Sequence, residues 1–285
     1  MATSRRAFMQ AAGMVAASAA ASQIHSAPLR MPIGLQLYSV RNQLPGDFAG
    51  TLAQLRSAGY SVVEAAGYFD RSAADFRRAM DTAGLRCVGT HHTLSELETH
   101  LDQWVDYARS LGLEYIVCSS SGGMHRDPAA KGPQTLDDWR WVAGELNRIG
   151  EKVKDAGMTL GVHNHVPEFA VLDGVVVYDE LLRLTDPKLV TFEMDCGWVV
   201  ASGHNPLDYL RKSPERFQLM HVKDMIAGAS GQMHSTELGR GTIDYAPIMR
   251  AATGLKYYFI EQEEFEIDAM QALRIDSEYM RRLNV

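Results

Sequence analysis

The sequence predicts a single parallel (β/α)8 barrel, and three observations lead to this fold class. Eight short apolar runs alternate with helical patterns along the chain, at the period expected of βα units. A glycine repeatedly stands between the end of a helical pattern and the next apolar run. No Gly-x-Gly-x-x-Gly sequence follows the first run, which disfavours the competing architecture, an open doubly wound sheet. The 285 residues suit one such barrel, with no linker that would divide the chain.

The predicted strands are runs of five to seven residues in which apolar side chains dominate. In chain order they are 33–38, 61–65, 85–90, 114–119, 158–163, 189–195, 217–221 and 257–261. Helical spacing of apolar residues, with three- and four-residue intervals, fills the segments between them. The predicted helices are 47–58, 73–83, 94–111, 136–156, 178–184, 206–211, 245–252 and 269–283.

Glycines punctuate five of these units in the same way. They are Gly59, Gly84, Gly112, Gly157 and Gly254, each followed by an apolar residue that opens the next strand. Glycine adopts the left-handed backbone conformation that ends many helices at low cost, so we predict this conformation at all five positions. Later units use Asp186-Pro187 and Pro214 instead.

The composition is ordinary for a globular protein and excludes several classes of function. Hydrophobic residues make up 46% and charged residues 22% of the chain. The formal net charge of -7, spread along the chain, argues against a nucleic-acid-binding protein, which would carry a basic surface. The chain has three cysteines, so at least one is unpaired, and all three lie in or just after apolar runs. We therefore expect buried thiols and no disulfide framework.

Residues 1–27 differ from the rest and are typical of an export signal. Arg5 and Arg6 precede an Ala-rich run over 11–21, and no acidic residue occurs before Asp47. We interpret this segment as a twin-arginine signal peptide, and we expect an exported or periplasmic protein whose barrel spans 31–285. The Ala-rich run is too short and too weakly apolar for a transmembrane helix, so no stable membrane insertion is expected.

Four of the predicted strands end on a residue that can bind a metal ion. They are His163, Asp195, His221 and Glu261. The carboxyl ends of barrel strands meet at one mouth, so these side chains are predicted to converge there. A mixed set of imidazole and carboxylate ligands suits manganese, cobalt, iron or zinc better than calcium. His165 lies two residues beyond His163 and is an alternative fourth ligand.

Several motifs resemble the sugar phosphate isomerase/epimerase family, the xylose isomerase-like TIM barrels. These motifs cover 34–41, 161–169, 192–199, 221–224, 238–245 and 259–263. The resemblance implies one divalent metal ion, manganese in the first place, held by Asp195, His221 and Glu261. The family's fourth ligand is usually a glutamate, and here the position falls on His163. Epimerases of the family often have a histidine where this chain has Trp198.

The resemblance also implies a reaction. A metal-dependent isomerase or epimerase would abstract a proton next to the carbonyl of a non-phosphorylated sugar or keto-sugar, through a metal-stabilised enediolate. Glu261 would act on one face of the substrate, and Glu168 or His165 on the other. A dehydratase or lyase acting on a keto-sugar, keto-glycoside or inosose is the first alternative, and a non-catalytic sugar-binding barrel is the second. A metal-dependent phosphoesterase fits the acidic chain less well.

Other residues near the predicted strand ends are candidates for contact with the sugar. They are Gln36, Tyr38, His91, Trp198 and Lys223. For Lys223 a salt bridge to a neighbouring carboxylate is an equal alternative, and Trp198 could simply pack. The expected partner is a small-molecule sugar, with no nucleic acid; the sequence leaves a homo-oligomer open.

Overall fold

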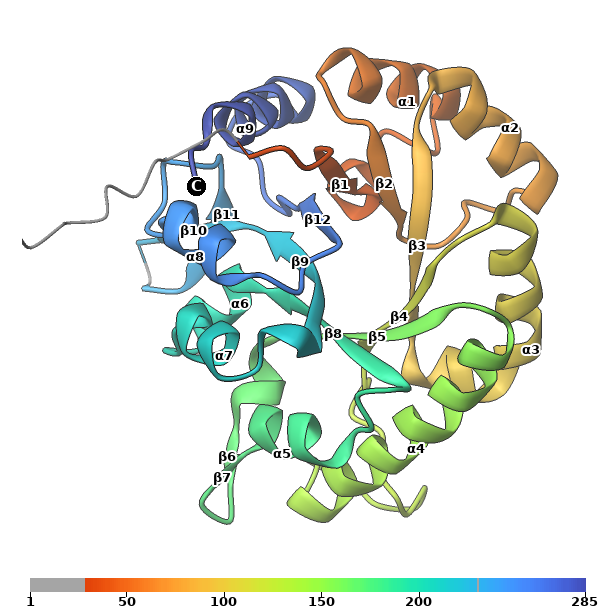
Figure 1. The fold of residues 1–285 in the computed structure, drawn as a ribbon, viewed down its shortest axis with the longest axis vertical. Helices are drawn as coiled ribbons and strands as arrows, with labels where there is room; N and C mark the ends of the chain where they lie inside the picture. Colours follow the sequence, from red (N-terminus) through yellow and green to blue (C-terminus); the bar gives the residue numbers. More distant parts are fainter. Residues whose placement is uncertain (1–28, 230) are drawn as a thin grey trace, which may run out of the picture.

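The computed structural model describes residues 29–229 and 231–285, which form a closed barrel of eight parallel strands ringed by helices (Figure 1). The strands pair in the order β1-β12-β9-β8-β5-β4-β3-β2. Their bounds are Gly34–Gln36 (β1), Val62–Ala65 (β2), Arg86–Thr93 (β3), Tyr115–Ser120 (β4), Thr159–His163 (β5), Val190–Asp195 (β8), Phe217–Val222 (β9) and Tyr257–Ile260 (β12). The predicted single (β/α)8 barrel is therefore confirmed.

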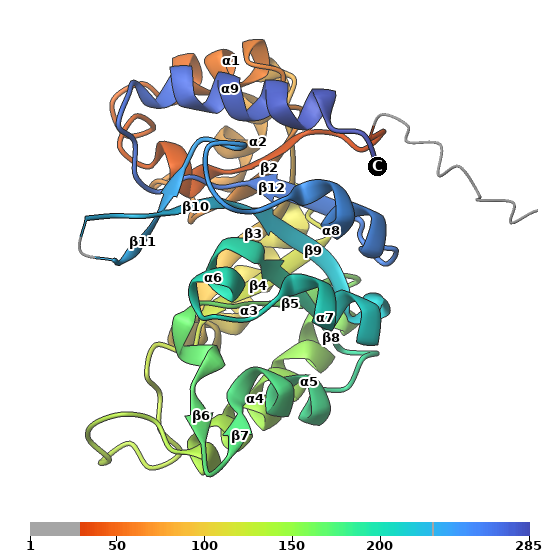
Figure 2. The same cartoon turned by 90° about the vertical axis from the view of Figure 1, so that its left-hand side faces the viewer.

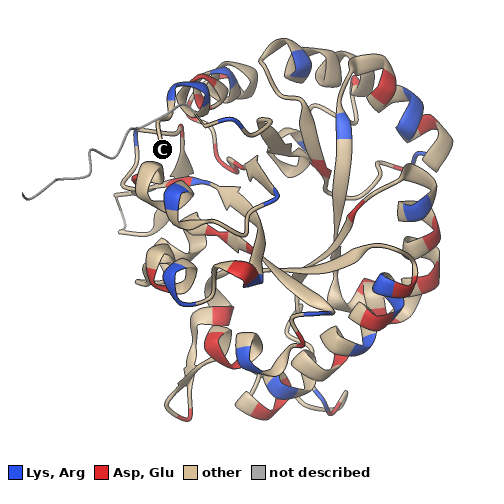
Figure 3. Ribbon diagram, in the orientation of Figure 1, with Lys and Arg blue, Asp and Glu red and all other residues tan. Residues whose placement is uncertain are grey.

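All eight predicted helices are present on the outside of the barrel. They are Phe48–Ser57 (α1), Ala73–Ala83 (α2), Leu94–Leu111 (α3), Leu136–Asp155 (α4), Val177–Leu184 (α5), Pro206–Lys212 (α7), Tyr245–Ala251 (α8) and Ala269–Arg282 (α9). The two longest begin with reciprocal capping boxes at Thr93 and Thr135, which satisfy backbone N–H groups of the first turn. Acidic and basic residues are interspersed along the outer helices (Figure 3).

The glycine prediction holds at four of its five positions. Gly59, Gly84, Gly112 and Gly157 have positive φ angles, but Gly254 does not appear among the residues with a left-handed backbone. At Gly254 a Cβ atom would lie 2.3 Å from the carbonyl oxygen of Pro214. Close backbone packing therefore requires this glycine, and the expectation of a left-handed cap there is wrong.

The structure adds elements that the sequence pattern does not resolve. One is the helix Cys196–Ala201 (α6), which begins directly at the end of β8. The others are two hairpins and three 3-10 helices: Val171–Leu172 with Val175–Val176 (β6, β7), Asp224–Ala227 with Met233–Thr236 (β10, β11), Leu37–Val40 (η1), Val166–Phe169 (η2) and Pro214–Arg216 (η3). The β10–β11 hairpin extends beyond the barrel at the left of Figure 2.

Two strand boundaries change the placement of candidate residues. β1 ends at Gln36, because its side chain accepts a hydrogen bond from the backbone N–H of Tyr38 and starts η1. Tyr38 therefore lies on η1, beyond the strand. β3 runs to Thr93, so His91 and His92 lie within the strand and not after it.

The predicted signal peptide, residues 1–27, lies outside the described residues. Among residues 29–229 and 231–285, every helix is too short or too polar to cross a lipid bilayer.

Candidate metal centre and cavity

The four predicted metal ligands converge at the carboxyl mouth of the barrel. His163 and Asp195 are the last residues of β5 and β8, His221 is the penultimate residue of β9, and Glu261 follows β12. Nδ1 of His221 lies 3.1 Å from Oε2 of Glu261 and 3.8 Å from Oδ2 of Asp195, and Nε2 of His163 lies 3.9 Å from the same Asp195 oxygen. All four side chains are buried.

Parallel pairing explains why these side chains meet. Asp195 is directly opposite His221 in the β8–β9 pair, and Phe259, two residues before Glu261, is opposite His221 in the β12–β9 pair. Alternate residues of a strand point to the same face, so Glu261 follows Phe259 into the barrel. The ligand candidates therefore share one level of the barrel interior.

The buried donor atoms fit a divalent metal ion. Asp195, His221 and Glu261 offer donor atoms within 4.8 Å of one another. Oδ2 of Asp195 is buried, and its close partner is the Lys223 ammonium at 2.8 Å. A carboxylate oxygen has two lone pairs, so it can bind a metal ion beside the lysine. The mixed nitrogen and oxygen set suits a transition metal or zinc.

A second donor set lies deeper in the barrel and shares His221. It consists of His91, His163, Glu193 and His221, again with donor atoms within 4.8 Å of one another. Oε2 of Glu193 lies 2.7 Å from Nε2 of His91, 3.1 Å from Nδ1 of His163 and 3.1 Å from Nε2 of His221. His221 thus joins the deep set through Nε2 and the mouth set through Nδ1.

Glu193 was not predicted from the sequence, and Glu64, in the second predicted strand, could from sequence alone either face the barrel or pair with a basic side chain. Glu64 faces the barrel interior, where its Oε2 lies 3.0 Å from His91 and 2.9 Å from His221, and accepts a hydrogen bond from Gln36 at 2.7 Å. The available signal was the strand period, because Glu193 stands two residues before Asp195 and so shares its face.

The surroundings of His91 and His163 shift their pKa values in opposite directions. Burial alone would lower the pKa of His91, but the carboxylates of Glu64 and Glu193 outweigh it and raise this pKa to about 10. For His163 burial dominates and lowers the pKa, with only partial compensation from Glu193 and with repulsion from His221. A neutral imidazole is the form that binds metal ions, and His163 is kept in that form.

Lys223 lies among the predicted metal ligands. It forms salt bridges to neighbouring carboxylates, which the sequence analysis gave as the alternative to contact with the sugar. Its ammonium is fully buried and lies 2.8 Å from Asp195, 2.8 Å from Glu261 and 2.5 Å from Glu263. Gly197 permits this arrangement, because a Cβ there would come within 2.9 Å of the lysine side chain. Burial favours the neutral amine, but the three carboxylates prevail and raise the pKa of Lys223.

The segment after β5 holds two of the predicted acid–base groups. His165 faces the cavity at the mouth, with its ring centroid 4.6 Å from that of His163. Glu168 is buried and does not line the cavity; its Oε2 accepts the backbone N–H of His165 at 2.9 Å. Burial raises the pKa of Glu168 to about 7. Its contact fixes the backbone that carries His165.

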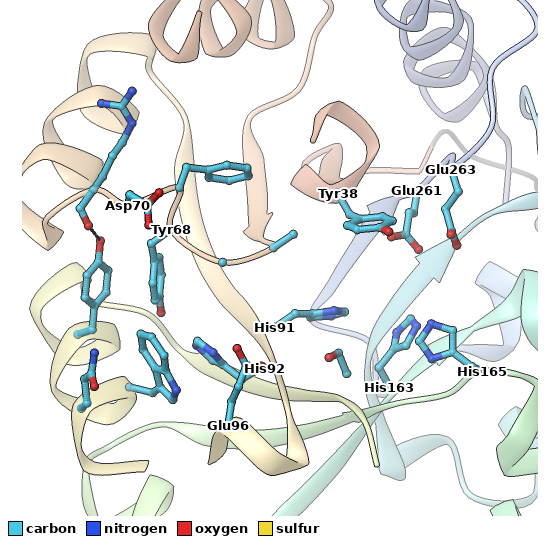
Figure 4. Close-up of a pocket in the computed structure, with 18 residues that line it drawn as sticks. Tyr38, Tyr68, Asp70, His91, His92, Glu96, His163, His165, Glu261 and Glu263 are labelled. Carbon is cyan, nitrogen blue, oxygen red and sulfur yellow. Dashed lines mark hydrogen bonds between the residues drawn. The ribbon is translucent and has the colours of Figure 1, made fainter. Parts of the chain in front are cut away.

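A cavity of about 640 Å³ opens beside the metal-ligand candidates (Figure 4). Five sequence candidates line it: Tyr38, His91, His163, His165 and Glu261. The others stand behind the cavity wall: Gln36, Glu168, Asp195, Trp198, His221 and Lys223. The centre of the Trp198 ring lies 4.6 Å from the Lys223 ammonium. Trp198 therefore packs on Lys223, which is one of the two roles that the sequence analysis considered for it.

Comparison with known proteins finds both similar sequences and similar solved structures. An inosose dehydratase of Geobacillus kaustophilus (strain HTA426) is 26% identical, with 72% of this chain and 76% of that protein covered. A sugar phosphate isomerase/epimerase from Parabacteroides distasonis ATCC 8503 superimposes with a TM-score of 0.74 at 26% identity, covering 89% of this chain and 94% of that one.

A more distant structure shares the fold alone. It is an IolI protein described with a bound zinc atom, with a TM-score of 0.66 at 13% identity over 87% of this chain and 96% of that one. The sequence pattern described as the xylose isomerase-like TIM barrel matches residues 52–283. A match of that extent, on a closed eight-stranded barrel whose mouth carries convergent imidazoles and carboxylates, places this chain in the xylose isomerase-like TIM barrel family.

Proposed function

We propose that the protein is a metal-dependent lyase that removes a proton next to the ketone of a keto-sugar or cyclitol ketone and expels the hydroxyl group one carbon further on. The relatives named inosose dehydratase support a cyclitol-like ketone. The substrate is not phosphorylated at the reacting end, because Arg71 is the single Lys or Arg among the described residues that line the cavity, and it stands away from the metal-ligand candidates.

The observation that carries this proposal is the unlike pair of acid–base groups on the cavity wall. Glu261 and His165 line the cavity from two different strand ends, and Figure 4 draws them on different sides of the His163 ring. Epimerisation needs two equivalent groups that take and return a proton on opposite faces. Elimination needs a base for carbon and an acid for a leaving oxygen, which a carboxylate and an imidazole can divide between them.

The reaction balances without a further reactant. Glu261 takes the proton from the carbon next to the ketone, and the electron pair of that C–H bond moves to form a carbon–carbon double bond. The neighbouring C–O bond breaks, and the protonated imidazole of His165 gives the departing oxygen its proton, so that water leaves. Burial lowers the pKa of His165, which makes its imidazolium a stronger acid, and the proton taken by Glu261 must return to His165 before the next turnover. A divalent metal ion held by Asp195, His221, His163 and Glu261 would supply the positive charge that stabilises the ketone oxygen as it becomes negative.

The chain's other residues hold this pair in place. Lys223 neutralises Asp195 and Glu261 from behind the wall, which keeps Glu261 ionised; Lys223 and the neighbouring histidines outweigh burial and hold the pKa of Glu261 low. The carboxylate of Glu168 fixes the backbone of His165. Each reacting group therefore has a buried partner that limits its motion.

Epimerisation is the second candidate, because a solved structure of 26% identity is described as a sugar phosphate isomerase/epimerase. One experiment separates the two. Manganese-loaded protein is incubated in D2O with inosose and with a panel of ketohexoses, and the products are followed by NMR. We expect an unsaturated or diketone product together with loss of water. Deuterium incorporation with inverted configuration and no loss of water would replace the lyase with an epimerase.

Variants test the assigned roles. Glu261→Gln and His165→Gln are each expected to lower the rate by about 10²–10⁴-fold, the range typical of general acid–base groups. His204→Gln is the matched control, because His204 packs on Phe169 and does not line the cavity. Full activity in His165→Gln would remove the imidazole from the mechanism.

We also propose that residues 1–27 direct export by the twin-arginine pathway, as the paired Arg5 and Arg6 indicate. Mass spectrometry of the protein recovered from a periplasmic fraction would find an N-terminus near residue 28. An intact N-terminus on protein confined to the cytoplasm would contradict the proposal.

A further inference from the structure

We infer that the cavity has a second subsite, which binds a second sugar ring joined to the ring that reacts, so that the substrate is a glycoside of two rings. This inference rests on the proposed function for the reacting ring. The second subsite is called here the outer lobe: its walls are the β2–α2 loop, residues 66–71, and one face of α3 with Gln103, Trp104 and Tyr107. In Figure 4 the outer lobe lies around Tyr68 at the left, opposite Glu261 and His165.

The two parts of the cavity lie on opposite faces of β3. His91 points into the barrel, where it contacts Glu64 and Glu193, whereas its neighbour His92 stacks on Trp104 of α3 at a centroid distance of 4.5 Å. Neighbouring strand residues point to opposite faces, so one sugar ring cannot fill both parts. The whole cavity, about 640 Å³, falls within the roughly 300–1,000 Å³ that enclose ligands of several rings.

The β2–α2 loop is held in a shape that builds the outer lobe. Phe69 and Asp70 both have left-handed backbone angles, φ 54° and 57°, which are uncommon for residues other than glycine. The loop is fastened to α3, because the Tyr107 hydroxyl donates a 2.6 Å hydrogen bond to the carbonyl of Arg71. The Arg71 guanidinium also lies 4.1 Å from the ring centre of Phe48. Consecutive strained residues that line a cavity are typical of binding sites.

The helix wall is also locally distorted. At His100 the backbone of α3 leaves helical geometry, with φ -133° and ψ 26°. Gln103, Trp104 and Tyr107 follow within the next two turns, share one helix face and line the cavity. A break in a helix changes the direction of the turns that follow it, and here those turns carry the aromatic wall.

Aromatic rings and polar edges alternate in the outer lobe. Tyr68 stacks on Tyr107 at a centroid distance of 3.8 Å, and the Tyr68 and Trp104 centroids are 6.0 Å apart. The polar side chains of Asp70, Glu96 and Gln103 line the same space. Apolar ring faces bordered by hydrogen-bonding groups match a sugar ring, which has C–H faces and a rim of hydroxyl groups.

One buried donor in this wall has no partner. The indole Nε1 of Trp104 makes no hydrogen bond, whereas burial raises the pKa of the neighbouring Tyr68 hydroxyl and a hydrogen bond with Thr90 partly offsets that rise. Tyr68 is 7% exposed. A buried donor without an acceptor costs about 1–3 kcal/mol, so native proteins rarely keep one without a use. Hydroxyl groups of a second ring can accept from Trp104 and either accept from or donate to Tyr68.

The test measures binding and needs no turnover. Isothermal calorimetry on the manganese-loaded protein compares the methyl glycosides of glucose, galactose and xylose with a disaccharide that begins with each sugar. We expect at least one disaccharide to bind tenfold or more tightly than its methyl glycoside. Trp104→Phe and Tyr68→Phe keep an aromatic ring at each position but remove the indole N–H and the hydroxyl, and each should reduce that preference to threefold or less. The melting temperature of Tyr68→Phe should stay near the wild-type value, because its ring and its stacking on Tyr107 remain.

Trp141→Phe on α4 and Tyr257→Phe on β12 are matched controls outside the cavity and should keep the preference. Disaccharides that bind no more tightly than their methyl glycosides would overturn the inference. The inference would also be overturned if phenyl glycosides bound as tightly as disaccharides, relative to the methyl glycosides, and lost no affinity in Trp104→Phe. The outer lobe would then bind an apolar group and not a sugar ring. A disaccharide preference without lyase or epimerase turnover would keep this inference and reject the proposed function, and turnover of inosose alone without the preference would do the reverse.

Discussion

Two layers of the same barrel interior, only two residues apart along the strands, have opposite chemistry. The lower layer is an apolar cluster of Val62, Val88, Tyr115, Val117, Leu219 and Phe259. The upper layer contains the carboxylates and imidazoles, with Glu64 two residues after Val62 and His221 two residues after Leu219. Both layers are shielded from solvent. The comparison therefore separates the effect of burial from the effect of residue type.

The lower layer can be explained by packing alone, but the upper layer cannot. Buried apolar side chains stabilise the fold in proportion to the area they remove from water. Buried charges lower stability unless they are paired, and even paired ones often contribute nothing net. The chain nevertheless keeps a lysine, four carboxylates and three imidazoles in and above this level, and one oxygen each of Glu64 and Glu193 accepts no hydrogen bond. Residues of the lower layer therefore stabilise the barrel, whereas residues at the carboxyl end of the strands serve its function.

The largest effect on stability is expected in the lower layer. Phe259→Ala would remove a fully buried ring from the apolar cluster, and should lower the free energy of unfolding by about 3–5 kcal/mol. Metal content per folded molecule should not change, because Phe259 offers no donor atom. Urea unfolding and metal analysis measure the two quantities. Phe265→Ala, a half-buried phenylalanine outside the barrel, should cost less.

The opposite variant in the upper layer completes this comparison. His221 pairs directly with Phe259 across β9 and β12. His221→Ala should lose the metal, whereas Phe259→Ala should retain it. If His221→Ala retained the metal, or Phe259→Ala lost it, metal binding would not be a property of the upper layer alone.

The next largest effect on stability is expected from removing the buried lysine above the upper layer. Lys223→Met removes the only ammonium that faces Asp195, Glu261 and Glu263 among the described residues, and leaves their charges uncompensated. Breaking a buried ion pair in this way costs about 3–5 kcal/mol. We expect that loss in metal-free protein, and a larger stabilisation by manganese than in wild type, because the metal ion restores positive charge beside the same carboxylates.

Thermal melts with EDTA and with saturating manganese measure this difference. Lys256→Met, an exposed lysine, is the control and should melt like wild type in both conditions. An equal manganese-induced shift in Lys223→Met and wild type would mean that the metal ion and the lysine do not share these carboxylates.

The sequence predicts the barrel and the mouth ligands because both follow from local patterns. His163, Asp195, His221 and Glu261 are recognisable as polar residues that end apolar runs, and parallel pairing then brings them together. Glu193 was missed because it lies inside a strand between Phe192 and Met194, where a polar residue looks like an interruption. Only the period of two, counted back from Asp195, indicates that it faces the same interior.

The outer lobe could not be predicted from local patterns at all. Its loop depends on left-handed angles at Phe69 and Asp70, which are not glycines, and its helix wall depends on a break at His100 inside a regular apolar pattern. Lys223 shows the same limit: the sequence placed it at a strand end but could not choose between sugar and salt bridge. Contacts between distant segments decide such questions, and they are absent from a short window of sequence.

A charged cluster on the outer surface should have the smallest effect. Glu180 on α5 accepts hydrogen bonds from Arg183 at 2.8 Å and Arg140 at 2.9 Å, and these contacts lower its pKa from 4.5 to about 2. Because the pKa is lower in the folded protein, this stabilisation is present above about pH 4.5 and is lost as the pH falls toward 2. Both arginines are about half exposed, so solvent screening reduces it to about 1 kcal/mol.

Glu180→Gln should therefore lower the free energy of unfolding by about 1 kcal/mol at pH 7 and by much less near pH 2.5, where the wild-type carboxylate is itself partly protonated. Urea unfolding at both pH values, with the exposed Glu151→Gln on α4 as control, measures the difference. A cost at pH 7 as large as that of Lys223→Met would mean that the exposure of Arg140 and Arg183 does not weaken their pairing with Glu180, which is itself 5% exposed. A cost near 1 kcal/mol would assign the larger cost at Lys223 to an ion pair in which both partners are buried.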